Sequence, residues 1–219
     1  GAEGTGPRFA DLLQALVALS PQMRLSIRYI EPKPFMKNAE LLKSLCDSGN
    51  IDLLYVSLQS GSEKILRAMN RNPDLSKISD AYATFRNTTD VVFYCNWMVG
   101  FPGETENDFQ QTLKLARALN LHINVAIPFS ARPGTPAEHH ADQIDDKTKE
   151  YRLSRLSLEL ANMKAAMFEQ QLSFLDDEAR RSLLQQIKLA EMQQYQAGLV
   201  EERPLVFQKR LQTSDGGNA

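Results

Sequence analysis

Cysteine is scarce in this chain: its 219 residues contain two, Cys46 and Cys95, which lie far apart in the sequence. Two distant thiols exclude a disulfide framework, and they are too few to hold an iron–sulfur cluster by themselves. Each is predicted to be a buried, inert thiol, Cys46 on a helix and Cys95 within a strand. The adjacent His139 and His140 predict no metal site either, because neighbouring side chains on a regular element point apart.

Positive charge is not in excess. The chain has 25 Lys and Arg against 27 Asp and Glu, which gives a net charge of −2. This balance lacks the usual electrostatic signature of nucleic-acid binding, although it does not exclude RNA. No apolar run approaches the roughly 20 residues that span a bilayer, and no secretory pattern is present. We therefore expect no membrane partner and a cytoplasmic location.

Strands and helices alternate over the first 145 residues, and 42% of the chain is hydrophobic, enough for one sizeable core. Strands are predicted at residues 24–30, 53–58, 91–99 and 123–129. Helices are predicted at residues 39–46, 62–69, 76–86 and 105–119, after an N-terminal helix near residues 9–19. Because a helix-length segment follows each strand, the strands must be parallel and joined by crossovers. The predicted fold class is α/β.

Beyond residue 145 the pattern becomes helical. Apolar side chains recur at spacings of three and four residues at Leu153, Leu156, Leu160, Met163 and Met167. This spacing favours a helix that packs on the sheet or on another helix, and a short partner-binding zipper stays open as an alternative. A second helix is predicted near residues 183–195, capped by Asp176 or Asp177. The polar, glycine-rich residues 208–219 are predicted to be disordered.

Three motifs occur in order along the chain. Residues 58–71 read LQSGSEKILRAMNR, residues 100–105 read GFPGET, and residues 130–137 read SARPGTPA. The first two each follow an apolar strand and open a helix, so both turns are expected at the same edge of the sheet. Together the motifs resemble the radical S-adenosylmethionine (SAM) methylthiotransferases, whose sequences read LQSGSD, GFPGET and SPRPGTPA at these places.

The resemblance implies SAM and a [4Fe-4S] cluster as cofactors. The family holds the cluster on a C-x-x-x-C-x-x-C loop, and the ligands of that loop are absent from this chain. We therefore expect residues 1–145 to be the C-terminal portion of a partial (β/α) barrel whose first strand or two are missing, residues 146–207 to be a helical extension, and residues 208–219 to be a tail. The missing N-terminal part, or a partner, would cover the open sheet edge.

Polar side chains near the predicted strand ends are candidates for holding SAM, which presents an amino group, a carboxylate and a ribose diol. The resemblance places cofactor-binding residues at Glu31, Gln59, Arg71, Asn96, Met98, Val99 and Gly100. Asn96 departs from the family's Asp, and the loss of charge weakens any contact with a cation. Simpler interpretations stay open: Glu31 as a solvated strand end, and Arg71 paired at the surface with Asp74 or Asp80.

The function implied is the SAM-binding part of a radical SAM enzyme, a methylthiotransferase that modifies tRNA or a ribosomal protein. The chain by itself is expected to bind no cluster and to be inactive, and no catalytic residue is assigned. Two alternatives remain. One is a degenerate radical SAM-like scaffold or binding module that uses its C-terminal helices. The other is a different radical SAM chemistry, because the motifs locate the cofactor rather than the substrate.

Overall fold

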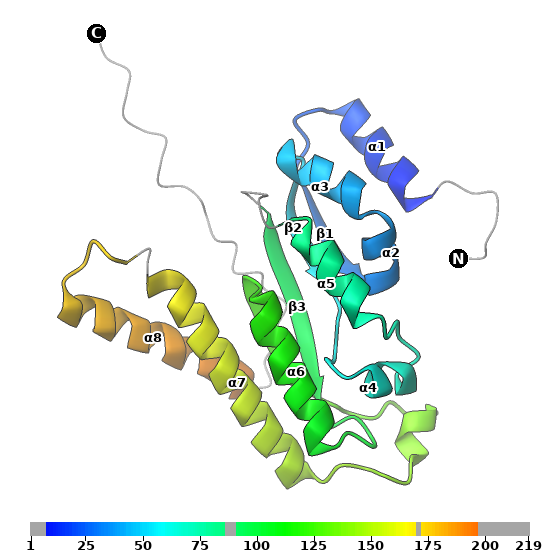
Figure 1. Ribbon diagram of the computed structural model, residues 1–219, viewed down its shortest axis with the longest axis vertical. Helices are drawn as coiled ribbons and strands as arrows, with labels where there is room; N and C mark the ends of the chain where they lie inside the picture. The colour runs from blue at the N-terminus through cyan, green and yellow to red at the C-terminus, as the bar shows by residue number, and fades with distance from the viewer. Residues whose placement is uncertain (1–7, 86–90, 170–171, 197–219) are drawn as a thin grey trace.

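A single parallel sheet forms the centre of the molecule. The computed structural model describes residues 8–85, 91–169 and 172–196 (Figure 1). Its strands are β1 (Leu25–Ile30), β2 (Ile51–Val56), β3 (Val92–Val99) and β4 (Ile123–Pro128). They pair in the order β1-β2-β3-β4, all parallel, which confirms the predicted α/β class and strand direction. All four carboxyl ends therefore meet at one edge.

Helices connect the strands and follow the sheet. Their bounds are α1 Phe9–Leu19, α2 Pro32–Lys37, α3 Ala39–Asp47, α4 Glu63–Ala68, α5 Leu75–Ala83, α6 Glu106–Leu119, α7 Asp146–Glu169 and α8 Asp177–Gln196. A short 3₁₀ turn spans Pro136–His139. Helix α2 was not predicted, because its sequence contains two prolines; both lie in the first turn, where a missing N–H costs little. No described helix has the length and apolar character needed to cross a bilayer.

Side-chain caps fix where several helices begin. Thr105 forms a capping box at the start of α6, and the Ser62 hydroxyl accepts from the Ile65 N–H at the start of α4. At α8, Asp176 accepts the N–H groups of Glu178 and Ala179 at 3.0 and 2.9 Å. Asp176 is therefore the cap, and Asp177 is the first helical residue.

One face of the sheet packs against the helices. Phe93, Cys95, Trp97 and Val99 alternate along β3 and join a buried core with residues of the helices, such as Phe109 of α6. The Trp97 side chain is fully buried, and its indole N–H donates to Asn124 Oδ1 at 2.8 Å. The residues between them on β3 point to the opposite face.

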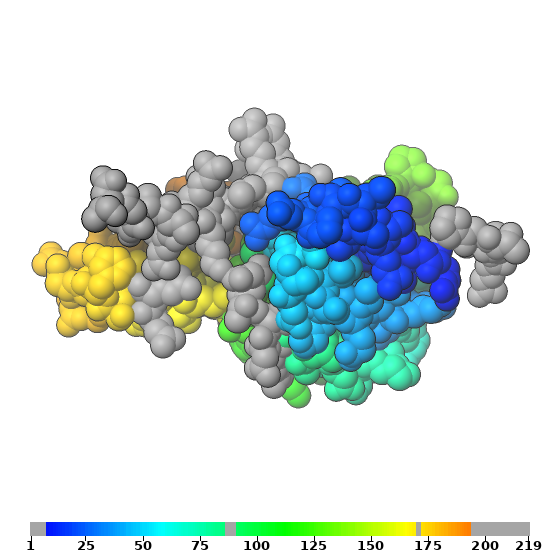
Figure 2. Space-filling view, turned by 90° about the horizontal axis from the view of Figure 1, so that it is seen from above, coloured from blue at the N-terminus to red at the C-terminus, as the bar shows by residue number. Residues whose placement is uncertain are grey.

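The predicted apolar seam of α7 packs on this core rather than forming a separate zipper. Leu156 and Leu160 are buried in the core, and Leu153 and Met163 pack against it. Helix α8 lies on α7, where Lys164 Nζ and Glu191 Oε2 are 2.6 Å apart and largely buried. The two helices extend from the side of the sheet opposite α1–α3 (Figures 1 and 2). The predicted tail at residues 208–219 lies outside the described residues.

Candidate functional site

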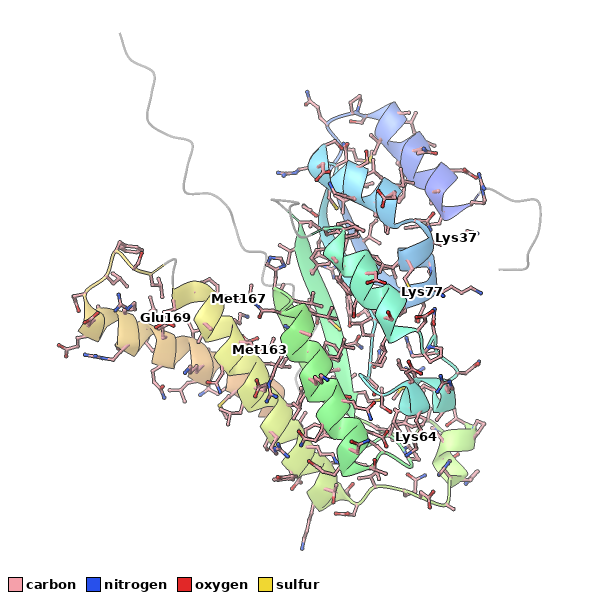
Figure 3. The ribbon with its side chains drawn as sticks, in the orientation of Figure 1. Lys37, Lys64, Lys77, Met163, Met167 and Glu169 are labelled. Carbon is pink, nitrogen blue, oxygen red and sulfur yellow. The ribbon has the colours of Figure 1, made fainter. Side chains whose placement is uncertain are left out.

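Asp108, in the first turn of α6, joins the two motif turns. Its carboxylate accepts from the Ser62 hydroxyl at 2.6 Å, from the Thr105 hydroxyl and N–H at 2.6 and 2.9 Å, and from Lys64 Nζ at 2.9 Å. Lys64 also donates to the Gly103 carbonyl at 2.7 Å and lies where α4 faces the loop before α6 (Figure 3). The turns after β2 and β3 are thus held together by one buried carboxylate.

The environment of Asp108 keeps it ionised. Burial alone would raise the pKa of its carboxyl, but the hydrogen bonds from Ser62, Thr105 and Lys64 lower that pKa well below the usual range. The negative charge also lies at the N-terminal end of α6, where the helix dipole favours it. The carboxylate that joins the two turns is therefore ionised at neutral and mildly acidic pH.

Gly61 is where the turn after β2 meets α6 most closely. Its N–H donates to the Thr112 hydroxyl at 2.9 Å, and Ser60 Oγ lies 3.2 Å from the same hydroxyl. A Cβ at Gly61 would stand 2.4 Å from the Gln111 carbonyl oxygen and 2.6 Å from the Thr112 Cα. The motif therefore requires glycine here because of close backbone approach, without any unusual φ.

Gly61→Ala is expected to lower the free energy of unfolding by about 1–3 kcal/mol, because the atoms it meets are backbone and cannot rotate away. Urea unfolding followed by circular dichroism measures the change. Gly49→Ala gives a comparison, since no atom lies within 4 Å of its Cβ and only its positive φ is disturbed. A Gly61→Ala protein as stable as the unsubstituted chain would contradict the close packing.

Helix α7 is fastened to the turn after β3 by a buried ion pair. Arg152 Nη1 donates to Glu104 Oε2 at 2.9 Å and to the Glu104 carbonyl at 3.0 Å, and the two side chains are 7% and 1% exposed. The same carboxylate oxygen accepts the Gly100 N–H at 2.7 Å. Burial raises the pKa of Glu104, and the Gly100 N–H and Arg152 only partly offset that rise. Sequence reasoning missed Arg152, although an arginine beside the apolar seam was a signal for it.

The structure brings Glu31 and Arg71 together. Arg71 Nη1 donates to Glu31 Oε2 at 2.7 Å and to the Ser57 carbonyl at 3.2 Å, so the arginine bridges the ends of β1 and β2. The surface pairing of Arg71 with Asp74 or Asp80 is not seen, and Asp74 pairs with Lys77. The Arg71 and Glu31 side chains are 26% and 52% exposed, which leaves both within reach of a ligand.

Gln59 and Asn96 form a second pair of candidates. The Gln59 N–H donates to the Asn96 carbonyl at 3.0 Å, and the Met98 N–H donates to the Gln59 carbonyl at 2.7 Å, so the chain after β2 continues to pair with β3. Gln59 takes a φ of +71°, which is uncommon for a residue other than glycine. Both side chains are buried, yet Gln59 Oε1 and Asn96 Oδ1 have no hydrogen-bond partner among the described residues.

The main chain of residues 98–100 is largely engaged within the protein. The Met98 N–H donates to Gln59, the Val99 carbonyl accepts from the Phe129 N–H at 2.8 Å, and the Gly100 N–H donates to Glu104. The Val99 side chain faces the core. Gly100 has a φ of +78°, and a Cβ there would lie 2.4 Å from Lys149 Cγ. Any ligand contact by Val99 therefore involves the main chain.

The two cysteines do not fit an iron–sulfur cluster. Cys46 on α3 and Cys95 on β3 are both buried, and burial raises the pKa of Cys46 to about 12 and that of Cys95 further. His139 contacts Glu138, and His140 Nδ1 accepts the Asp142 N–H. In the described part of the chain, no three His, Cys, Asp or Glu side chains are grouped to hold a metal.

In the loop at residues 130–137, Thr135 Oγ1 donates to the Arg132 carbonyl at 2.7 Å.

These features define an α/β protein with a partial barrel of parallel strands, whose polar candidates lie near the carboxyl ends of β1, β2 and β3. A search of protein families finds the radical SAM superfamily over residues 1–116. The chain belongs to the radical SAM superfamily.

Curated relatives make the resemblance more specific. The chain is 36% identical to the tRNA-2-methylthio-N(6)-dimethylallyladenosine synthase of Rickettsia typhi over 173 residues, which is 76% of this chain and 38% of that protein. It is 34% identical to the enzyme of the same name from Stutzerimonas stutzeri over 158 residues, 71% of this chain and 36% of that protein. The chain thus spans less than two fifths of the length of these relatives.

A solved structure supports the fold. Coproporphyrinogen III oxidase of Escherichia coli, described as a radical SAM enzyme, matches with a TM-score of 0.51 and 19% identity. The match covers 73% of this chain and 36% of that chain. It confirms the architecture of a partial radical SAM barrel.

Proposed function

We propose that this chain is the SAM-binding part of a radical SAM methylthiotransferase that acts on tRNA. The observation that carries the proposal is the pair of buried, unpartnered amide oxygens, Gln59 Oε1 and Asn96 Oδ1, near one edge of the sheet. A buried polar atom without a partner is costly, so native proteins rarely keep one without a reason. The ammonium and ribose hydroxyls of SAM supply the donors that these oxygens lack.

The partly exposed side chains of Arg71 and Glu31 suit the remaining polar groups of SAM. We infer that Arg71 binds the methionyl carboxylate, because a guanidinium has five N–H donors and can serve this group while it keeps Ser57. Glu31 then becomes free to accept from an ammonium or a hydroxyl. Asn96 offers a dipole instead of a charge, so its contact with a cation is weaker than that of an aspartate. Met98, Val99 and Gly100 are proposed to contact the adenine through their main chain.

The two buried cysteines do not fit the [4Fe-4S] cluster of the family, and no group of three metal-ligating side chains is found in the described residues. The proposal extends to the complete enzyme, where the cluster ligands and the strands that cover the outer edge of β1 would come from the rest of the protein or from a partner. The relatives named as tRNA-modifying enzymes favour tRNA over a ribosomal protein as substrate, and a cytoplasmic location agrees with that substrate.

SAM should bind this chain weakly, with a Kd of about 0.1 mM or poorer, and Arg71→Ala should weaken binding about tenfold. The loss is modest because Arg71 and Glu31 are partly exposed and solvent screens the pair. Ligand-observed NMR titration measures affinities in this range. Arg67→Ala is the matched control, since Arg67 on α4 is 61% exposed and pairs with Glu63 in its own helix.

Equal SAM affinity in Arg71→Ala and Arg67→Ala would contradict the assignment of Arg71. A chain that binds no SAM at millimolar concentration would instead favour the scaffold alternative. Exposed apolar side chains on and between α7 and α8 support that alternative, among them Leu158, Phe174 and Leu189. A different radical SAM chemistry stays compatible with SAM binding, and only the substrate distinguishes it.

A further inference from the structure

Three tyrosines form a row across the sheet on the face opposite the core. Tyr55 of β2 and Tyr94 of β3 are register partners with ring centroids 4.0 Å apart, and Tyr29 of β1 lies 4.5 Å from Tyr55. Their chain neighbours Leu54 and Phe93 belong to the helix-covered core. Since side chains alternate along a strand, the tyrosines point the other way.

Tyr29 is held in an unusual conformation at the outer end of the row. Its φ of +58° is rare for a bulky residue, and the pairing of β1 with β2 shifts register between Ile27 and Ile30. Such a bulge redirects a side chain, and strained residues of this kind cluster at functional sites. The Tyr29 ring packs against the Tyr55 ring at an interplanar angle of 39°, yet Tyr29 remains 49% exposed.

The surroundings of the row suit a nucleic acid. Arg28 is exposed and, among the described residues, forms no ion pair. Ile27 packs against the helix-covered core, so the next residue of β1, the exposed Arg28, points to the tyrosine side of the sheet. Its positive charge also acts against the rise that burial causes in the pKa of Tyr94. Asn96 follows Tyr94 by two positions on β3 and therefore shares its face. The row thus borders the candidate SAM site.

We propose that Tyr29, supported by Tyr55 and Tyr94, stacks against a base of the RNA substrate while Arg28 contacts a neighbouring phosphate. Aromatic side chains beside a cation are the usual means of holding unpaired bases. The adenine of SAM is proposed to lie at residues 98–100 of β3, whereas Tyr29 lies on β1, two strands away. This inference rests on the proposed function and adds the contact that would position the substrate.

The test measures binding of the 219-residue chain to a fluorescent, adenine-rich single-stranded RNA heptamer by anisotropy at fixed low salt. Tyr29→Ala should weaken binding roughly tenfold, whereas Tyr29→Phe should stay within about twofold, because the ring supplies the stacking. Arg28→Ala should weaken binding and reduce the salt slope by about one. Tyr151→Ala is the control: Tyr151 lies on α7, is 55% exposed, and should leave RNA binding unchanged.

SAM titrations of the same variants separate this inference from the proposed function. Unchanged SAM affinity in Tyr29→Ala, together with weakened RNA binding, supports the inference. Absence of RNA binding by the unsubstituted chain overturns it even where SAM still binds. Loss of SAM affinity without loss of RNA affinity would assign the row to the cofactor's adenine and also overturn it. Failure of Arg71→Ala to weaken SAM binding would contradict the proposed function and not this inference. Circular dichroism confirms that each variant is folded.

Discussion

Replacing Arg152 by alanine is expected to lower the free energy of unfolding by about 3–5 kcal/mol, because the change leaves a buried carboxylate without its cation. The Glu104 side chain is 1% exposed, and its other oxygen has no hydrogen-bond partner among the described residues. Without Arg152, this carboxylate would keep the hydrogen bond from the Gly100 N–H but would lose its cation. Urea unfolding at pH 7 measures the loss.

The pH dependence identifies the cause of that loss. Burial already raises the pKa of Glu104, and removal of Arg152 raises it further. At neutral pH the folded variant must keep a buried charge or take up a proton, while the unfolded chain ionises freely near its usual pKa of about 4.3. The stability difference between the unsubstituted chain and the variant should therefore shrink as the pH falls from 7 to 5.

Arg155→Ala is the matched control for Arg152→Ala. Arg155 is one turn further along α7, 37% exposed, and 3.0 Å from Glu106. An exposed pair of this kind contributes less than about 1 kcal/mol. If the two substitutions cost the same, or if the cost of Arg152→Ala did not depend on pH, the buried pair would not be what fastens α7 to the turn after β3.

Asp108→Ala is expected to cost about 3 kcal/mol, since it removes a buried carboxylate that accepts from the buried Ser62 hydroxyl and from the hydroxyl and N–H of Thr105. The most important donors are the hydroxyls of Ser62 and Thr105, both 2.6 Å from the carboxylate. The ion pair with Lys64 contributes less to the free energy of unfolding, because the Lys64 side chain is 58% exposed and solvent screens its charge. Chemical unfolding measures the loss, with Asp146→Ala as the control; the Asp146 side chain is 91% exposed and should cost less than about 0.5 kcal/mol.

Lowering the pH should show how much the ionised carboxylate of Asp108 contributes to the stability of the fold. The folded pKa of Asp108 lies below its unfolded value of about 3.9, so its contribution to stability is complete above that value. The contribution is lost as the pH falls toward the folded pKa. The gap in stability between the unsubstituted chain and Asp108→Ala should therefore stay constant from pH 7 to about pH 5 and narrow below pH 4. A gap that is constant down to pH 2 would contradict the role of the charge.

The strands and most helices could be predicted from the sequence because each signal is local. Alternation of apolar runs with turn residues placed all four strands and the helix that follows β3. Strand β2 begins earlier than predicted, at Ile51, because Ile51 pairs with Leu25 of β1. Pairing between strands is a property of the fold, and a single sequence does not display it.

The candidate site was predictable only as a set of residues, and its geometry was not. The motif resemblance selected Glu31 and Arg71, but their contact joins positions 40 residues apart. The tyrosine row depends on strand register and on the bulge at Tyr29, and neither can be predicted from the hydrophobic pattern. Arg152 lies outside the matched motifs, and its pairing with Glu104 depends on how α7 packs against the turn after β3.

Trp97 is an intrinsic fluorescence probe of this protein. It is the single tryptophan of the chain, and its ring is sealed in the core with its N–H bonded to Asn124. It directly follows Asn96, and its main chain forms a β-bridge with Gln59; these are the two residues whose amide oxygens are proposed to meet the cofactor. Its emission would respond both to ligand entry at that edge and to loss of the core. Titration and unfolding can thus be followed on the same native chromophore without attaching a dye.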